Sequence, residues 1–195
     1  MQAIVQDVYG GPEVLHFAEA PDPELRPRDL LVRVKAISVN PVDAKQRASG
    51  PAGSPVPNPP KIVGWDAAGV VEAVGAAVTL FRPGDEVYCA GDIARAGSYA
   101  ELLAVDERIV GRKPRNLSFA EAAALPLVAL TAWEALFEQL AIDPLGPARP
   151  ILIVGGAGGV GSVATQIARR VAGLHVARIE HLLSLIHISE PTRPY

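Results

Sequence analysis

The sequence contains one cysteine, Cys89, among its 195 residues. A single cysteine excludes an internal disulfide and a zinc site built from four cysteines, and it is typical of proteins in a reducing cytoplasm. Free cysteine also behaves as a small buried hydrophobe. We therefore expect a cytoplasmic protein in which Cys89 is a core residue.

Basic blocks, aromatic clusters and long apolar runs are also scarce. The formal net charge is −3 and aromatic residues make up 5% of the chain, unlike the basic surface typical of nucleic-acid-binding proteins. No apolar run approaches the roughly 20 residues of a membrane-spanning helix, and the N-terminus does not have the pattern of a signal peptide. The sequence therefore predicts neither a nucleic-acid partner nor an association with a membrane.

Hydrophobic residues make up 49% of the sequence, which is enough for a substantial core. Up to about residue 110 the chain has short apolar runs separated by proline and glycine turn signals, as in a compact all-β domain. Pro41 suits the first position of a helical turn over 41–47. Residues 50–60 contain five prolines and predict a surface loop. Strands are expected at 3–7, 15–19, 30–40, 64–75 and 97–105, and a turn is expected at Pro83-Gly84 within the segment 81–88.

Helical features begin after Asn116. Ser118 and Glu121 have the spacing of a capping box, which predicts a helix that Pro126 breaks or restarts. A second helical segment is expected at 127–140. A linker over 143–147 then leads to an apolar strand that begins at Ile151.

The glycines that follow this strand are the strongest chemical signal. The apolar run 151–154 predicts a strand buried on both faces, as in a parallel sheet. Gly156, Gly158 and Gly161 then fit the pattern G-x-G-x-x-G, which permits a tight turn and close approach of the backbone to a pyrophosphate. A helix over 160–172 would direct its free N–H groups at the phosphates. The stretch predicts a dinucleotide site, and an ordinary glycine-rich loop is the alternative.

The chain contains, in order, the motifs Val39–Asp43, Gly64–Val71, Gly84–Val87, Leu125-Pro126 with Thr131-Ala132, and Gly155–Gly161. In this order the motifs resemble the medium-chain dehydrogenase/reductase superfamily, and in particular its zinc-independent quinone oxidoreductase branch. The resemblance covers residues 1–176. It implies a mixed α and β fold, with a GroES-like β-barrel substrate domain at 1–117. The connecting helices and the truncated start of a Rossmann domain would follow at 118–176, with the active site in the cleft between the domains.

The resemblance also implies an activity. It implies hydride transfer from NADPH to a quinone or an α,β-unsaturated carbonyl, and a homodimer for the full-length protein. A zinc-type alcohol dehydrogenase is one alternative. A non-catalytic NADPH-binding or sensor protein is another, because fold does not fix function.

Zinc is not expected. Zinc alcohol dehydrogenases of the superfamily have a cysteine near the position of 40–43 and a histidine-glutamate pair after the glycine that corresponds to Gly64. Trp65 and Asp66 stand at that pair, and no cysteine lies near 40–43. Catalytic zinc needs three protein ligands, and no such set is evident among Cys89 and the four histidines, His16, His175, His181 and His187.

Without a metal, the reaction depends on positioning and on polar groups that stabilise a developing oxyanion. Asn40, Asp43 and Lys45 are the catalytic candidates. The resemblance implies that Asn40 and Thr131 face the nicotinamide-ribose end of NADPH. The residues expected to bind the pyrophosphate are Gly156, Gly158, Gly159, Val160 and Gly161.

Each candidate also has a purely structural interpretation. Asn40 suits a turn before Pro41, Asp43 suits a helix start, and Lys45 suits a solvated surface. Two aromatic residues near these motifs are expected to be structural. Trp65 is expected in the core, with the wall of a pocket as the alternative, and Tyr99 on a strand.

The resemblance ends after Val176. Residues 177–195 are expected to be a non-family tail, in which Leu183–Tyr195 looks like translated adapter sequence, although a divergent natural end is the alternative. Arg178 and Glu180 fall near the position that selects NAD or NADP, but a foreign tail would report nothing about this choice. We therefore expect a fragment of an enzyme that exposes apolar surface, binds NADPH weakly or not at all, and is inactive.

Overall fold

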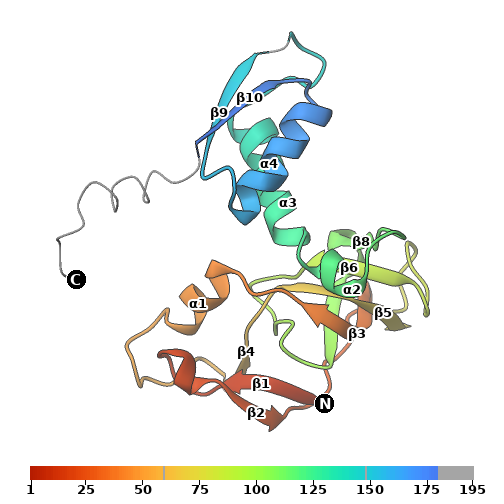
Figure 1. The fold of residues 1–195 in the computed structure, drawn as a ribbon. Coiled ribbons are helices and arrows are strands. Elements are labelled where there is room, and N and C mark those ends of the chain that lie inside the picture. Colours follow the sequence, from red (N-terminus) through yellow and green to blue (C-terminus); the bar gives the residue numbers. More distant parts are fainter. Residues whose placement is uncertain (59, 148, 180–195) are drawn as a thin grey trace, which may run out of the picture. The chain divides into compact units, whose positions relative to one another are not determined.

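The computed structural model describes residues 1–58, 60–147 and 149–179, and the chain forms two compact units, Met1–Leu127 and Val128–Tyr195 (Figure 1). We call them the N-terminal and the C-terminal unit. The division lies inside helix α3 (Pro126–Trp133). The expected domain boundary after residue 117 stays a prediction. The expected tail at 177–195 falls outside the described residues from 180 onward, together with Glu180, His181 and His187.

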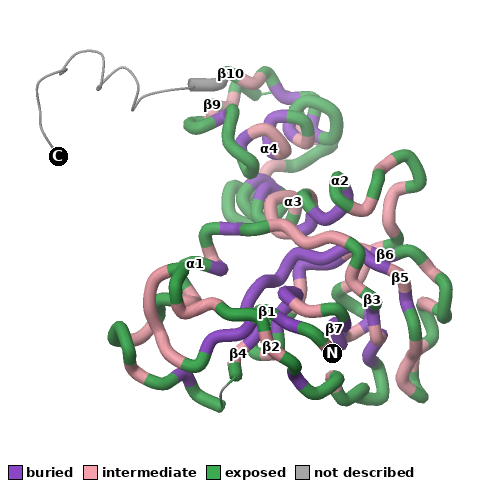
Figure 2. The backbone as a smooth tube through the Cα atoms, turned by 60° about the horizontal axis from the view of Figure 1, so that its bottom comes forward, coloured by how far each residue is buried: buried purple, intermediate pink, exposed green. Residues whose placement is uncertain are grey.

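A five-stranded antiparallel sheet in the order β7-β3-β5-β6-β8 is the centre of the N-terminal unit. Register shifts occur where β3 pairs with β5, between Leu31 and Val32 and between Val34 and Ala36, and such irregularities bend a strand pair. Buried residues follow these strands (Figure 2), and Cys89 is among them, as expected. The strands are β3 (Asp29–Ile37), β5 (Asp66–Val74), β6 (Glu86–Ala90), β7 (Leu102–Asp106) and β8 (Val110–Arg112). Their main core residues are Leu30, Val32, Ala67, Val71, Val87, Cys89, Leu103 and Val105.

A second sheet, in the order β2-β1-β4, belongs to the same unit. The Ile4 backbone N–H donates to the Tyr99 carbonyl at 2.8 Å, which ties β1 to the chain just before β7. The two sheets form a curled half-barrel, and with the helices of the chain they make the mixed α and β fold that the sequence predicts. The strands are β1 (Gln2–Gln6), β2 (His16–Glu19) and β4 (Lys61–Ile62), and a 3₁₀ turn, η1 (Pro12–Val14), joins β1 to β2.

The short helices begin where the sequence predicts them. Helix α1 (Pro41–Arg47) occupies the predicted turn, and α2 (Phe119–Ala123) begins at the predicted capping box. The Ser118 backbone N–H donates to the Glu121 carboxylate at 2.8 Å, and the Glu121 N–H donates to the Ser118 hydroxyl at 3.3 Å. A 3₁₀ turn, η2 (Glu107–Ile109), precedes β8.

One predicted strand is wrong in its first half. The segment 97–105 is a strand only from Leu102. The Gly97, Ser98 and Tyr99 N–H groups donate to carbonyls of residues 62–64 at 2.8–3.1 Å. This stretch therefore hydrogen-bonds to the end of β4 and the residues that follow it, outside any regular strand. The Tyr99 side chain is buried there.

The C-terminal unit contains a strand-helix-strand element in which β9 and β10 pair in parallel. Small residues of α4 pack in one core cluster with Ala132 of α3 and Leu136 of η3, together with Ile151 and Ile153 of β9. The elements are α3 (Pro126–Trp133), which spans the division between the units, the π-helix η3 (Glu134–Gln139), β9 (Pro150–Val154), α4 (Gly159–Arg170) and β10 (His175–Ile179).

The expectation that the strand at 151–154 is buried on both faces is wrong for this structure. Ile151 and Ile153 pack into the core of the unit, but Leu152 is 56% and Val154 66% exposed. Helices cover only one face of the two-stranded sheet in the described residues. The side chains of β9 therefore alternate between a packed face and an exposed apolar face.

The expectation that no apolar stretch approaches the length of a membrane-spanning helix needs correction. The helical stretch Phe119–Gln139 has 21 residues and a mean hydropathy of 1.4, and is long and apolar enough to cross a bilayer by these criteria alone. Core helices of soluble proteins meet the same criteria. The stretch is interrupted at Ala124-Leu125, before Pro126, so α2 and α3 are separate helices.

Candidate active site

Asn40 lies at the junction between β3 and α1. Its backbone is extended, with φ −121°, and Pro41 follows at the first helical position. The Asn40 backbone N–H donates to Oδ2 of Asp43 at 2.8 Å. A carboxylate in the first helical turn also interacts favourably with the helix dipole. Local structure therefore accounts for the position of Asp43.

Asp43 has a second, long-range partner. The Tyr99 hydroxyl donates to the same oxygen, Oδ2, at 2.9 Å in a buried environment. Burial raises the pKa of Tyr99, and the neighbouring Asp43 carboxylate raises it further, so the phenol remains protonated and donates. The sequence missed this role because the two residues are 56 positions apart.

Asp66 is the first residue of β5, and its side chain is fully buried. Its Oδ2 accepts from the Asn40 side-chain Nδ2 and from the Ser38 hydroxyl, both at 2.8 Å. Its Oδ1 accepts from the Leu127 backbone N–H at 2.9 Å. Burial raises the pKa of Asp66, while these three hydrogen bonds oppose the rise. The carboxylate therefore joins the end of β3, the start of β5 and the first turn of α3.

The contact with Asp66 fixes the orientation of the Asn40 carboxamide. A carboxylate offers only acceptors, so the NH2 group, and not the carbonyl oxygen, must face it. Ser38 Oγ lies 3.3 Å from the same Nδ2. The other end of the carboxamide faces the Asp43 backbone N–H in the capping box of α1, and the residue as a whole is only 7% exposed. Both ends of the carboxamide therefore face partners within the N-terminal unit.

The other candidates of the N-terminal unit differ in their surroundings. Lys45 lies on α1 and is exposed. Trp65 is 4% exposed, which confirms the expected core position. Its indole Nε1 is buried without a partner in the described part of the chain, as are Asp43 Oδ1 and Gln6 Oε1.

The glycine loop lies in the C-terminal unit, between β9 and α4. Gly155 has φ +72°, and the Gly158 N–H donates to its carbonyl at 3.0 Å, closing a tight turn. A Cβ atom at Gly161 would overlap the Gly155 carbonyl oxygen. Gly161 therefore has to be glycine, as the dinucleotide pattern requires.

Helix α4 opens directly after this turn. Gly158 is its N-cap, and the Ser162 N–H makes the first bond of the helix, to the Gly158 carbonyl at 2.8 Å. An α-helix leaves the N–H groups of its first residues, here Gly159, Val160 and Gly161, without intrahelical partners. Buried Gly156 completes the loop. The loop is thus a glycine cradle that fits a pyrophosphate.

Thr131 lies on α3 and is exposed, next to buried Ala132. Asn40, Asp43 and Lys45 are brought together at α1 in the N-terminal unit. Thr131 and the glycine cradle belong to the C-terminal unit.

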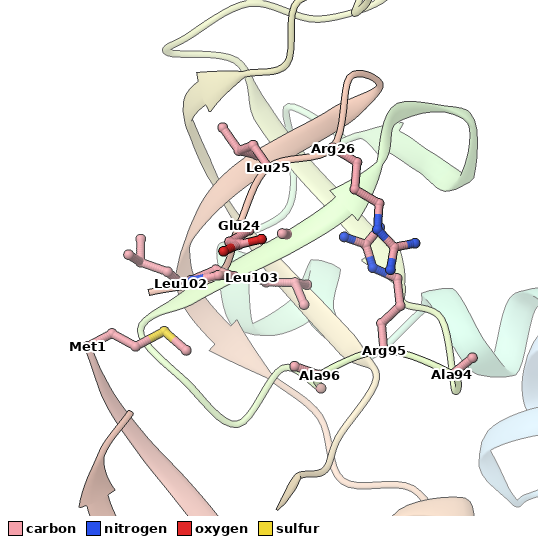
Figure 3. A pocket seen from close by; sticks show the side chains of 12 residues that line it. Met1, Glu24, Leu25, Arg26, Ala94, Arg95, Ala96, Leu102 and Leu103 are labelled. Atoms are coloured by element: carbon pink, nitrogen blue, oxygen red, sulfur yellow. The ribbon is translucent and has the colours of Figure 1, made fainter. Parts of the chain in front are cut away.

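A pocket of about 430 Å³ lies elsewhere in the N-terminal unit (Figure 3). Two of its lining residues are Arg26 and Arg95. Both Nη groups of Arg95 donate hydrogen bonds to the buried Asp29 carboxylate, at 2.9 and 2.5 Å. The ion pair gives this arginine a structural role. Of the candidates that the structure describes, none lines the pocket. The lining residues include Met1, Glu24, Leu25, Arg26, Arg95 and Leu103.

Comparison with known proteins decides the family. Residues 26–115 match the alcohol dehydrogenase GroES-like domain. A chloroplastic NADPH-dependent alkenal/one oxidoreductase of Arabidopsis thaliana is 41% identical over 183 residues, which are 89% of this chain and 45% of the relative. The chain belongs to the medium-chain dehydrogenase/reductase superfamily. Its resemblance to the quinone oxidoreductases within the superfamily is also confirmed.

Two further members of the superfamily illustrate its range. A zinc-type alcohol dehydrogenase-like protein of Staphylococcus aureus is 49% identical over 146 residues, which are 73% of this chain and 42% of the relative. The Escherichia coli quinone oxidoreductase, solved in complex with NADPH, is 29% identical with a TM-score of 0.77, over 94% of this chain and 54% of that chain. This chain spans about half the length of the relatives it matches.

The donor set of a superfamily zinc site is not assembled in the residues described. No group of three or more His, Cys, Asp or Glu side chains there could hold a metal ion. Burial raises the pKa of the Cys89 thiol to about 12, and both oxygens of Asp66 already accept hydrogen bonds. These residues do not fit a zinc ion.

Proposed function

We propose that the protein, at the full length of its relatives, is an NADPH-dependent oxidoreductase. Its substrate class would be quinones and α,β-unsaturated carbonyl compounds, and it would act without zinc. The observation that carries the proposal is the glycine cradle at the start of α4, where the Gly155 carbonyl leaves no room for a side chain at Gly161. The NADPH named for the Arabidopsis and Escherichia coli relatives supports the choice of cofactor.

The chain's own residues would hold the cofactor at two places. The free N–H groups of Gly159, Val160 and Gly161, with the turn at Gly156 and Gly158, would bind the pyrophosphate. Asn40 and Thr131 would bind the nicotinamide-ribose end. When bound, NADPH supplies the hydride.

Residues of α1 would act on the substrate, directly or through Asn40. Lys45 is the exposed cation of this helix and would stabilise the negative charge that develops on the substrate oxygen. Asp43 would act through Asn40, because its carboxylate holds the Asn40 backbone N–H. No step in this scheme uses a metal. This agrees with the hydrogen bonds that both carboxylate oxygens of Asp66 already accept.

Turnover and metal content test the proposal together. Full-length protein is assayed for NADPH oxidation with a panel of quinones and enones, and for NADP-dependent oxidation of saturated alcohols, while zinc is measured by mass spectrometry. We expect enone- or quinone-dependent oxidation that chelators do not affect. Alcohol oxidation with stoichiometric zinc would instead identify a zinc-type alcohol dehydrogenase, as the name of the Staphylococcus aureus relative suggests.

Tight NADPH binding without turnover across the panel would favour a sensor role. The proposal also includes a cytoplasmic location and a homodimer for the full-length protein. Light scattering on the purified protein measures the second, and a monomer at assay concentrations would contradict it.

A further inference from the structure

Strand β7 forms one edge of the five-stranded sheet of the N-terminal unit. It pairs with β3 on one side, and within the described residues no strand pairs with its other side. The pocket of about 430 Å³ lies against this strand, and Leu102, Leu103 and Ala104 are among its lining residues (Figure 3). We call it the β7 pocket.

Hydrogen bonds at the two ends of the pairing show which residues of β7 face β3. The Val34 N–H donates to the Glu101 carbonyl just before β7, and the Glu107 N–H donates to the Arg28 carbonyl just after it, both at 2.9 Å. Both bonds continue the register of the ladder. Hydrogen-bonded pairs alternate with non-bonded pairs in an antiparallel ladder. The odd-numbered residues of β7 therefore direct their backbone groups to β3.

The even-numbered residues Leu102 and Ala104 direct their backbone N–H and C=O groups to the free edge. Both residues are buried, and both line the β7 pocket. Buried backbone groups are nearly always paired, yet no partner for these groups is recorded in the part of the chain that the structure describes. An unpaired strand edge of this kind is a template for another strand.

Two arginines from different segments line the same pocket. The Arg95 side chain is 13% exposed and is held by the buried Asp29 carboxylate. Asp29 Oδ2 also accepts the Arg26 backbone N–H at 3.0 Å. Arg26 itself is exposed, and no hydrogen bond of its guanidinium is recorded among residues 1–58, 60–147 and 149–179. One buried carboxylate thus anchors both segments, and the charge of Arg26 is left for a ligand.

An acidic side chain lines another part of the pocket. Glu24 lies apart from the guanidinium groups of Arg26 and Arg95 (Figure 3). Like charges that face one another weaken binding. The pocket therefore suits a ligand with one carboxylate better than an acidic tract.

We propose that the β7 pocket binds an extended peptide segment, which adds to β7 as a further strand and places one carboxylate beside Arg26 and Arg95. A segment of about three to four residues spans the distance from Leu102 to Ala104. Main-chain hydrogen bonds would supply affinity, and the arginines would select the carboxylate. The inference goes beyond the proposed function and does not depend on it, because every residue it uses belongs to the N-terminal unit.

Hydrogen exchange followed by NMR on the 195-residue chain tests the free edge. Without a ligand, the amides of Leu102 and Ala104 should exchange about tenfold faster than those of Leu103 and Val105, because only the latter two are bonded to β3. An acetylated tetrapeptide of alternating valine and threonine, with a free C-terminal carboxylate, should slow this exchange and shift the Leu102 and Ala104 signals. Equal protection of all four amides in the free chain, or no response to millimolar peptide, would overturn the inference.

Changes to the peptide separate its backbone from its carboxylate. A C-terminal amide should bind about threefold more weakly than the acid, and an aspartate at the last position of the amide should restore binding if a side-chain carboxylate serves as well. N-methylation at successive positions should weaken binding at every second position, because only alternate N–H groups would face β7. Equal binding of the neutral amide, a uniform effect of N-methylation, or equally tight binding of butyrate, which has no backbone, would each overturn the inference.

Arg26→Gln tests the pocket itself. It should weaken binding of the acid peptide about threefold and leave the neutral amide unaffected, and the exposed position of Arg26 leaves the fold intact. Arg82→Gln is the matched control, since the Arg82 side chain is 86% exposed and lies outside the pocket. Equal weakening by the two variants would assign the attraction to net charge and overturn the inference.

Discussion

The hydroxyl of Tyr99 donates a hydrogen bond to Oδ2 of Asp43 at 2.9 Å, in the interior of the N-terminal unit. The same oxygen accepts the backbone N–H of Asn40. One carboxylate oxygen thus fixes the start of α1 and joins it to the chain that leads into β7. The candidate site is built on this contact, because Asn40 and Lys45 flank Asp43.

Tyr99→Phe should therefore destabilise the N-terminal unit. The variant leaves the buried Asp43 oxygen without one of its two donors, which costs about 1–3 kcal/mol. Urea unfolding followed by the fluorescence of buried Trp65 measures the change. Tyr88→Phe is the control, since no hydrogen bond of the Tyr88 hydroxyl is recorded in the described residues, and equal losses in the two variants would contradict the prediction.

Local signals in the sequence predicted the short elements well. The proline at position 41 marks the start of α1, and Ser118 with Glu121 marks the start of α2, because each signal acts within four residues. The core position of Trp65 was also predicted, in preference to the wall of a pocket, and this residue is 4% exposed. Such patterns determine an element without reference to the rest of the fold.

The polar network around Asn40 could not be predicted in the same way. The partners of Asp66 lie 26, 28 and 61 residues away along the chain, and their meeting depends on the pairing of β3 with β5. Two register shifts interrupt this pairing, and a shift of one residue turns a side chain to the other face of a sheet. The sequence analysis therefore used Asp66 only as evidence against a zinc site and did not predict its hydrogen bonds.

Two glycines of the cradle should respond differently to substitution. Gly155 has φ +72° with open space where a Cβ would lie, whereas a Cβ at Gly161 would overlap the Gly155 carbonyl oxygen. Alanine at either position should lower stability by about 1–3 kcal/mol. Asparagine tolerates the left-handed conformation, so Gly155→Asn should recover stability relative to Gly155→Ala.

Gly161→Asn should be at least as damaging as Gly161→Ala, because the larger side chain increases the overlap. Hydrogen exchange of the α4 amides, followed by mass spectrometry on the 195-residue chain, measures stability in the C-terminal unit itself. Recovery by asparagine at both positions, or at neither, would show that the two glycines are needed for the same reason.

Cys89 should be inert in the folded protein. It is buried in the core of the five-stranded sheet, and burial raises the pKa of its thiol to about 12, so little thiolate forms near neutral pH. We expect no reaction with a disulfide reagent under native conditions and one equivalent in urea. Ser49→Cys places a thiol at an exposed position after α1 and should react at once, and equally fast native labelling of Cys89 would contradict its burial.

Lys45→Ala tests the proposed chemistry of α1. If Lys45 stabilises the developing oxyanion, its loss should lower kcat by about a hundredfold and leave the KM for NADPH unchanged. Lys35→Ala removes an exposed lysine of β3 and serves as the control for surface charge. A rise in KM for NADPH with kcat unchanged would instead assign Lys45 to cofactor binding.

Glu107 should make stability depend on pH in the acid range. Its buried carboxylate accepts from the Leu80 and Thr79 N–H groups at 2.8 and 2.9 Å and from Arg28 at 2.9 Å. The hydrogen bond from Leu80 is the largest cause that lowers the pKa of Glu107 below its ordinary value of 4.5, with smaller help from Thr79 and Arg28 and against the effect of burial.

A carboxyl group with a lowered pKa in the folded state binds fewer protons there than in the unfolded chain. Its contribution to stability is therefore complete above about pH 4.5 and is lost as the pH falls through the lowered folded-state value. Glu107→Gln removes this contribution, so urea unfolding between pH 7 and pH 3 should show a gap from wild type that narrows toward acid. Exposed Glu24→Gln should follow the wild-type curve, and a gap for Glu107→Gln that stays constant or widens toward acid would show that the buried carboxylate is not the source of the acid sensitivity.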